Sequence, residues 1–229
     1  MDDPRWNAVD NYINDMFVGS DSALDAALKA SDDGGLPSIQ VAANQGKLLM
    51  LLARAQGARR ILEIGTLGGY STIWLARALP AGGRLITLEL DQKHATVARS
   101  NIARAGLAEK VEVRVGPALE SLKKLVAEKA EPFDFVFIDA DKTGYPDYLS
   151  WSLKLSHRGT MIIADNVVRD GAIADAKSED RSVQAVRRMN EMLAKEPRVS
   201  ATVLQTVGTK GYDGWAIALV TDGDGRGNP

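Results

Sequence analysis

From Gly57 onward, short apolar runs rich in β-branched residues alternate with longer segments of helical periodicity. This alternation predicts a parallel sheet, because parallel strands need crossover helices, and such crossovers are right-handed. The predicted strands are Arg60–Ile64, Arg84–Glu89, Val111–Val115, Phe133–Asp139 and Thr160–Asp165. The predicted helices between them are Tyr70–Ala78, Gln92–Ala105, Leu119–Ala130 and Tyr145–Leu155. The fold class is therefore α/β, with a doubly wound sheet.

Both ends of the chain depart from this alternation. Apolar periodicity predicts N-terminal helices at Trp6–Phe17, Ser22–Ala30 and Gln40–Ala55, with turn residues at Asp32–Pro37. The C-terminal part is predicted to hold one helix and then an antiparallel strand pair, at Arg181–Ala194, Val199–Thr206 and Trp215–Val220. We expect a single domain in which residues 1–56 cover a core formed by residues 57–220, and residues 221–229 form a disordered tail.

Composition narrows the classes of function. A chain of 229 residues with 45% hydrophobic residues is long enough to bury a core without disulfides or structural metal. Its 28 Lys+Arg against 30 Asp+Glu predict no strong attraction to nucleic acid or to anionic membranes. Cysteine is absent, the N-terminus lacks an apolar stretch of signal-peptide length, and no run of about 18 apolar residues occurs. We therefore expect a cytoplasmic protein without a membrane segment.

A glycine-rich turn follows the first predicted strand of the core. Gly65, Gly68 and Gly69 lie between an apolar strand and a helix, where glycine lets the backbone approach a ligand closely. The spacing is not G-x-G-x-x-G, because Leu67 and Tyr70 occupy the places of the second and third glycines. The turn therefore predicts a nucleoside-type ligand and disfavours a dinucleotide pyrophosphate.

Two acidic residues accompany this turn. Glu89 ends the second strand, where a carboxylate can accept hydrogen bonds from both hydroxyls of a ribose. The alternative is that the glycines serve helix packing and that Glu89 is a solvated strand end. Glu63 lies inside an apolar strand, and if buried it needs a partner such as an N–H group or the ammonium of an amino-acid cofactor.

Acidic and amide side chains also end the fourth and fifth strands. Asp139, Asp165 and Asn166 would converge at the carboxyl edge of the sheet if these strands are neighbours. Two carboxylates and an amide oxygen suit a hard cation such as Mg²⁺ better than zinc. The alternative is that Asp141 and Asn166 are turn or capping residues and that Asp139 is a hydrogen-bonded loop carboxylate.

Lys142 follows Asp139 by three residues, close enough to act on a substrate held at the predicted metal site. A nearby divalent cation disfavours the ammonium form and makes this lysine a candidate general base. The alternative for Lys142 is an ordinary solvated charge. His94 and His157 are predicted to be surface residues, because neither lies in a hydrolase-type strand–turn–helix elbow.

Together, several segments resemble the metal-dependent catechol and caffeoyl-CoA type O-methyltransferases, particularly the bacterial members. They are Ile61–Ser71, Leu88–Asp91, Gly116–Ala118, Phe137–Lys142, Asp165–Val167 and Asp170-Gly171. The resemblance implies a Rossmann-like methyltransferase fold, S-adenosylmethionine as cofactor, and a divalent cation, Mg²⁺ or another such as Mn²⁺ or Ca²⁺. It also implies a homodimer.

The resemblance further implies roles for individual residues. Asp139, Asp165 and Asn166 would bind the metal, and Lys142 and Asp139 would be catalytic. The residues around the cofactor would be Val41, Glu63, Gly65, Ser71, Glu89, Ala118 and Asp139. Arg169 replaces the aromatic residue of many relatives, which leaves the shape of the substrate open.

These inferences predict an S-adenosylmethionine-dependent, metal-dependent O-methyltransferase that acts on a small substrate with vicinal hydroxyls. Residues 173–181 and the hinge at Ser31–Pro37 would frame the substrate pocket and act as a lid. The alternatives are a tRNA hydroxyuridine O-methyltransferase of the same fold, a nicotinamide-dependent oxidoreductase, and a non-catalytic sensor of a nucleoside ligand.

Overall fold

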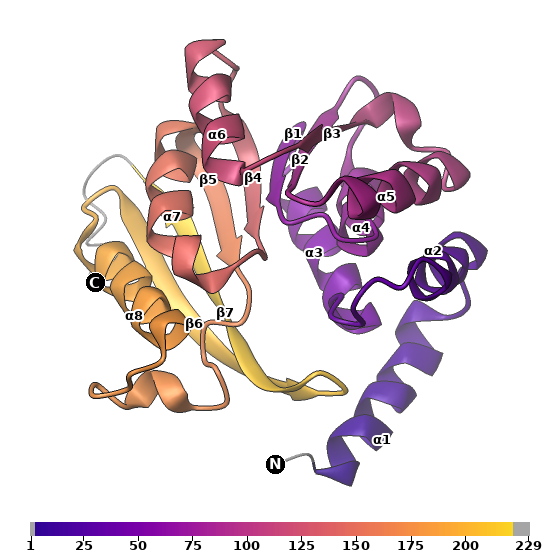
Figure 1. The fold of residues 1–229 in the computed structure, drawn as a ribbon, viewed down its shortest axis with the longest axis horizontal. Coiled ribbons are helices and arrows are strands. Elements are labelled where there is room, and N and C mark those ends of the chain that lie inside the picture. The colour runs from indigo at the N-terminus through magenta and orange to yellow at the C-terminus, as the bar shows by residue number, and fades with distance from the viewer. Residues whose placement is uncertain (1–2, 222–229) are drawn as a thin grey trace.

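The computed structural model describes residues 3–221, and its centre is a seven-stranded sheet (Figure 1). The order across the sheet is β3-β2-β1-β4-β5-β7-β6. Adjacent strands from β3 to β5 are parallel, whereas β7 is antiparallel to both β5 and β6. The strands are β1 (Arg60–Ile64), β2 (Arg84–Glu89), β3 (Val111–Val115), β4 (Phe133–Ile138), β5 (Ser156–Ala164), β6 (Val199–Gly208) and β7 (Gly211–Val220). The predicted fold class, including the antiparallel C-terminal pair, is confirmed.

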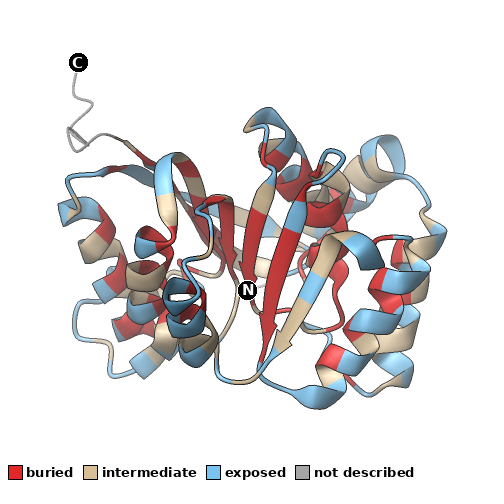
Figure 2. Cartoon of the chain, turned by 90° about the horizontal axis from the view of Figure 1, so that it is seen from above, coloured by how far each residue is buried: buried red, intermediate tan, exposed pale blue. Residues whose placement is uncertain are grey.

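Helices cover both faces of the sheet. The longer helices are α1 (Pro4–Ile13), α2 (Ser22–Asp33), α3 (Ala43–Ala55), α4 (Tyr70–Ala78), α5 (Gln92–Arg104), α6 (Ala118–Ala127), α7 (Tyr145–Lys154) and α8 (Arg181–Lys195). One apolar cluster joins α2, α3, α4 and α5 to the sheet, and a second joins α6, α7 and α8 to its other face. Figure 2 shows the resulting buried strands between helices whose outer sides are exposed.

The order of the strands places their carboxyl ends along one edge. In β1 and β4 the residues are buried on both faces, as expected for interior parallel strands. Because β1 lies between β2 and β4, its end adjoins two other strand ends. This is the switch point where ligands bind in doubly wound sheets.

Several predicted boundaries were wrong. The first helix ends at Ile13 and continues as a single π-helical turn, η1 (Asn14–Val18). Helix α3 begins at Ala43 rather than Gln40, because the Ala42 N–H donates to the Gln45 side chain (3.1 Å) and starts the helix there. Strands β6 and β7 extend to Gly208 and Gly211, so that only Thr209 and Lys210 connect them.

The predicted lid segment 173–181 contains the end of a short 3-10 turn, η4 (Ala172–Ala174), and Arg187 donates a hydrogen bond to the Ile173 carbonyl. Its movement stays a prediction. The predicted disordered tail lies, from residue 222 on, outside the described residues. Among helices within residues 3–221, none is long and apolar enough to cross a membrane.

Candidate active site

The turn after β1 brings two strand ends into direct backbone contact. Gly65 has a positive φ of 103°, and a Cβ built on it would lie 1.9 Å from the Asp139 carbonyl oxygen. Its N–H donates to the carbonyl of Leu88 at the end of β2 (3.0 Å). Only glycine fits this combination of conformation and close approach. The turn is therefore fixed relative to both β2 and β4.

Glu89 is held by the same turn. Its Oε2 accepts hydrogen bonds from the N–H groups of Thr66 (3.2 Å) and Leu67 (2.7 Å). Its Oε1 accepts one from the N–H of Asp91 (2.9 Å). Glu89 is only 7% exposed, so the alternative of a solvated strand end is wrong. Backbone donors orient this carboxylate, and its remaining lone pairs are available to a ligand.

Glu63 is fully buried, and hydroxyl groups surround its carboxyl. Its Oε1 accepts from the Ser71 hydroxyl (2.6 Å), and its Oε2 accepts from the hydroxyls of Thr72 and Thr87. Burial raises the pKa of Glu63 to about 7; the hydroxyl donors oppose this rise and the charge of Asp139 adds to it. The structure therefore supplies hydroxyl partners where the sequence led us to expect an N–H or an ammonium group. Ser71 separates Glu63 from the ligand space.

Substituting Glu63 should change how stability depends on pH. Because its pKa is near 4.5 when unfolded and about 7 when folded, the folded state binds more protons between these values. The Glu63 contribution to the free energy of unfolding is thus complete below about pH 4.5 and is lost as the pH rises through about 7. As the pH is raised from 5 to 8, we expect the free energy of unfolding of Glu63→Gln to increase relative to that of the parent, by a few kcal/mol at most. Urea unfolding at both pH values tests this; an unchanged difference would contradict it.

The ends of β4 and β5 bring the predicted acidic residues together. Asp139 follows β4 and donates its N–H to the Ile64 carbonyl (2.9 Å), while Asp165 follows β5 and donates to the Ile138 carbonyl (2.9 Å). Asn166 adopts a positive φ of 55°, and its N–H donates to Asp165 Oδ1 (2.6 Å). The three side chains therefore start from adjacent positions at the same sheet edge.

Asp139 and Asp165 are neighbouring carboxylates, and the positive charge near them is too small to offset their negative charge. Asp165 is 5% exposed, and burial, followed by the charge of Asp139, raises its pKa to about 7. Within residues 3–221 no group of three or more His, Cys, Asp or Glu side chains is arranged for a metal. The candidate set instead combines two carboxylates with the Asn166 amide, an oxygen donor set that fits a hard cation.

Lys142 lies within a short 3-10 turn, η3 (Lys142–Gly144), and its side chain is 11% exposed. Its Nζ donates to Asp139 Oδ1 (3.1 Å), to the Ala140 carbonyl (3.0 Å) and to the Tyr145 hydroxyl (2.7 Å). Tyr145 in turn donates to the carbonyl of Asp165 (2.8 Å). The alternative of a solvated lysine is therefore wrong.

Two tyrosines of α7 were not identified from the sequence. Tyr145 contacts Lys142 as described, and the Tyr148 hydroxyl donates to Asp141. Asp141 also accepts from the N–H of Gly144 (3.0 Å), so its alternative role as a turn residue is confirmed. The signal for both tyrosines was their spacing on one helix face, three and six residues after Lys142.

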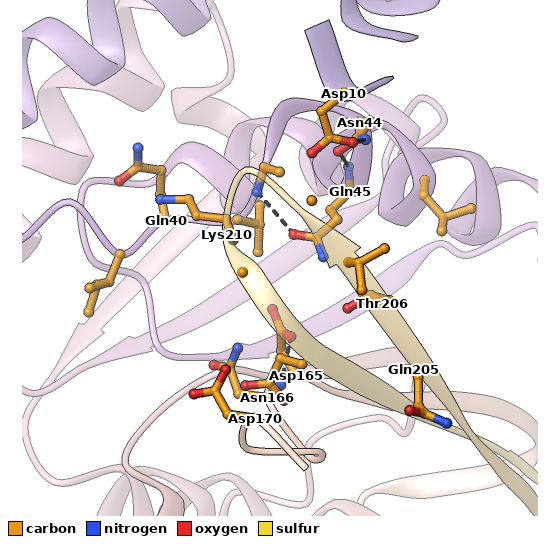
Figure 3. Close-up of a pocket in the computed structure, with 18 of the residues that line it drawn as sticks. Asp10, Gln40, Asn44, Gln45, Asp165, Asn166, Asp170, Gln205, Thr206 and Lys210 are labelled. Carbon is orange, nitrogen blue, oxygen red and sulfur yellow. Dashed lines mark hydrogen bonds between the residues drawn. The ribbon is translucent and has the colours of Figure 1, made fainter. Parts of the chain in front are cut away.

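Two cavities meet at this edge of the sheet. The strand-end cavity, of about 810 Å³, is lined by the predicted residues Val41, Gly65, Ser71, Glu89, Ala118, Asp139, Lys142 and Asn166. The hairpin cavity, of about 720 Å³, lies beside the β6–β7 hairpin and is lined by Asp165 and Lys210 among others (Figure 3). Val41, Asn166 and Arg169 line both cavities. A ligand in one cavity can thus meet a ligand in the other.

The histidine predictions have opposite outcomes. His157 is exposed and pairs with Asp134 (2.9 Å), so its prediction as a surface residue is confirmed. His94 lines the strand-end cavity, with a side chain 24% exposed and its Nδ1 3.5 Å from Glu89 Oε1. Its surface prediction was wrong, because α5 starts at the edge of the cavity and directs this first-turn side chain toward it.

A doubly wound sheet with a glycine turn, a fixed glutamate and a cavity over its carboxyl edge defines an α/β enzyme that binds a nucleoside-type ligand. The O-methyltransferase family model matches residues 18–218. A catechol O-methyltransferase from Niastella koreensis is 53% identical, over 96% of this chain and 100% of that protein. The structure of an O-methyltransferase from Bacillus cereus with SAH is 58% identical, with a TM-score of 0.94 over 95% of this chain and 99% of that one. TomG of Streptomyces achromogenes, an O-methyltransferase solved with SAM, is 53% identical, with a TM-score of 0.93 over 97% and 100% of the two chains.

The chain belongs to the O-methyltransferase family. The assignment made from its motifs, to the S-adenosylmethionine-dependent O-methyltransferases, is confirmed, and so is the prediction that the protein is an enzyme of this class. The alternative of a nicotinamide-dependent oxidoreductase was wrong.

Proposed function

We propose that this enzyme transfers a methyl group from S-adenosylmethionine to one of two adjacent hydroxyls of a small aromatic acceptor, with a divalent cation at the sheet edge. The observation that carries the proposal is that two neighbouring acids line different cavities, Asp139 the strand-end cavity and Asp165 the hairpin cavity. Asn166 lines both cavities. The near balance of 28 Lys+Arg and 30 Asp+Glu supports a small acceptor rather than tRNA.

The cofactor would occupy the strand-end cavity. Glu89, fixed by three backbone N–H groups, would accept hydrogen bonds from the ribose hydroxyls. Ala118, the first residue of α6, would contact the adenine, while Ser71 and Val41 would face the methionine end. Glu63 would act through Ser71 rather than by direct contact. The relatives solved with SAH and SAM support this assignment.

The residues at the sheet edge fit a divalent cation. Asp139, Asp165 and Asn166 would hold it, and a positive charge there would offset the burial and the charge of Asp139, which together raise the pKa of Asp165. Mg²⁺, Mn²⁺ and Ca²⁺ all favour such oxygen ligands. When bound, the cation would supply Lewis-acid chemistry that lowers the pKa of an acceptor hydroxyl.

Lys142 is the proposed base. Its Nζ lies 3.1 Å from Asp139 Oδ1, on the wall of the cavity assigned to the cofactor. Its Nζ donates hydrogen bonds to three acceptors, which fix its position, and as the base this nitrogen would accept the proton released by the acceptor hydroxyl. Direct in-line transfer needs no covalent enzyme intermediate.

The proposal is tested by titration calorimetry with SAH, followed by methyl transfer to catechol with Mg²⁺ and with EDTA. We expect SAH to bind and the methylated product to require Mg²⁺. Binding with turnover that EDTA leaves unchanged would refute the metal, and absence of SAH binding would refute the cofactor assignment.

We also propose that the enzyme is a homodimer. Exposed apolar side chains gather on α1, η1 and α3, including Tyr12 (63% exposed), Phe17 (62%) and Leu51 (50%). An exposed apolar surface of this kind favours association. Light scattering should give twice the chain mass of 24.6 kDa, and Phe17→Ser should shift the mass toward one chain; a monomeric parent protein would contradict the proposal.

The lack of cysteine supports a reducing, cytoplasmic setting.

A further inference from the structure

The residues from Glu89 to His94 form one fixed unit at the edge of the strand-end cavity. The N–H of Asp91 donates to Glu89 Oε1 (2.9 Å), and the Asp91 carboxylate accepts from the N–H groups of Lys93 (2.6 Å) and His94 (3.2 Å). Asp91 is thus the N-cap of α5, and it fixes the first turn of that helix. The end of β2 and the start of α5 therefore hold the side chains of Glu89 and His94 in a defined relation.

His94 faces Glu89 without a hydrogen bond to it. Its side chain lines the strand-end cavity, and its Nδ1 lies 3.5 Å from Glu89 Oε1, beyond the usual hydrogen-bond length of about 2.7–3.2 Å. Within residues 3–221, neither ring nitrogen of His94 has a hydrogen-bond partner. The imidazole is therefore a largely enclosed polar group beside the carboxylate that is assigned to the ribose.

The backbone donors around Glu89 are already used. The N–H groups of Thr66, Leu67 and Asp91 all donate to its carboxylate, and an ionised carboxylate can itself only accept. A ligand hydroxyl that donates to Glu89 would keep two lone pairs, and an enclosed oxygen without a donor costs free energy. His94 supplies that donor, because an oxygen about 2.8 Å from both Glu89 Oε1 and His94 Nδ1 fits beside two atoms 3.5 Å apart.

We propose that His94 is a second ribose-binding residue, whose Nδ1–H donates to a ribose hydroxyl of S-adenosylmethionine while the same hydroxyl donates to Glu89. The inference rests on the proposed placement of the cofactor in the strand-end cavity, and it adds a donor to that site. Glu89 accepts and His94 donates, so the pair recognises a group that is both donor and acceptor. A hydroxyl meets this requirement, whereas a hydrogen atom or an ether oxygen does not.

The test is calorimetry with SAH and with its 2′-deoxy and 3′-deoxy analogues. His94→Phe keeps an aromatic ring but has no donor, and we expect it to bind SAH about tenfold more weakly than the parent does. The parent and His94→Phe should bind the analogue that lacks the recognised hydroxyl with the same affinity. His94→Asn, which places an amide N–H near the position of Nδ1, should recover part of the affinity for SAH. His157→Phe removes the exposed histidine outside both cavities and should bind SAH like the parent.

Glu89→Gln separates this inference from the proposed function. If the ribose lies at Glu89, both Glu89→Gln and His94→Phe should lose affinity for SAH. A loss in Glu89→Gln alone would overturn the inference and leave the placement of the cofactor intact. An equal loss for SAH and for both deoxy analogues in His94→Phe would also overturn it, because His94 would then only pack against the ligand. Unchanged SAH affinity in Glu89→Gln would refute the placement of the ribose, and the inference with it.

Discussion

Asp165→Asn should abolish metal-dependent methyl transfer while the protein stays folded and continues to bind SAH. The variant removes one of two proposed anionic ligands, and Lewis-acid stabilisation worth several kcal/mol corresponds to a loss of about 1000-fold in turnover. SAH affinity should stay within about threefold, a shift of under 1 kcal/mol, because Asp165 lines the hairpin cavity and not the strand-end cavity. Initial rates over a range of Mg²⁺ concentrations measure the effect.

The stability of this variant distinguishes lost chemistry from lost structure. The Asp165 pKa is about 7 in the folded protein against 3.8 ordinarily, so its ionised carboxylate opposes folding above pH 7. In metal-free buffer at pH 8, Asp165→Asn should therefore unfold at no lower temperature than the parent. Glu109→Gln removes one carboxylate charge at an exposed residue of the turn before β3, outside both cavities and outside the predicted lid, and as the control it should leave turnover intact. Mg²⁺-stimulated turnover within about tenfold of the parent, under 1.4 kcal/mol in barrier, would refute the role of Asp165 as a metal ligand.

The sequence predicted the parts of this site that depend on local pattern. Interior parallel strands are apolar on both faces, so strands such as Arg60–Ile64 were predicted with the boundaries observed. Polar residues that follow such strands must lie at one edge of the sheet, and this rule predicted that Asp139 and Asp165 converge if their strands are neighbours, which the adjacency of β4 and β5 confirms. Glu89 was predicted for the same reason.

The features of the site that the sequence did not predict depend on contacts between segments that are distant in the chain. Asp10 accepts a hydrogen bond from the N–H of Thr209 in the hairpin, 199 residues away in the chain, and no local sequence pattern predicts that contact. The hydroxyl partners of Glu63 come from α4 and β2, and the choice among hydroxyl, amide and ammonium donors is made by packing. Lys210 gave no signal, because its proximity to Ser38 exists only once the hairpin folds back over the N-terminal segment.

Among substitutions that add a single methyl group within this site, Gly65→Ala should lower the free energy of unfolding the most. A Cβ at residue 65 would lie 1.9 Å from the Asp139 carbonyl oxygen, and the backbone would keep a φ of 103° that alanine disfavours. Strained backbone costs about 1–3 kcal/mol, and overpacking a further 1–3 kcal/mol. Together these are a large share of the roughly 5–15 kcal/mol by which domains are stable. Urea unfolding should show a lower midpoint, with most of the variant insoluble on expression.

Gly106→Ala separates the two causes. Gly106 also has a positive φ, of 73°, but an added Cβ there would meet no atom within 4 Å, so this variant carries the backbone strain without the overlap. We expect it to lose only about 1 kcal/mol. The excess loss in Gly65→Ala then measures the contact between the β1 turn and the end of β4. Because relieving that contact must displace Asp139, the soluble fraction of Gly65→Ala should bind SAH more weakly than Gly106→Ala. Equal destabilisation and equal SAH affinity in the two variants would show that the close approach of Gly65 to Asp139 has no energetic consequence.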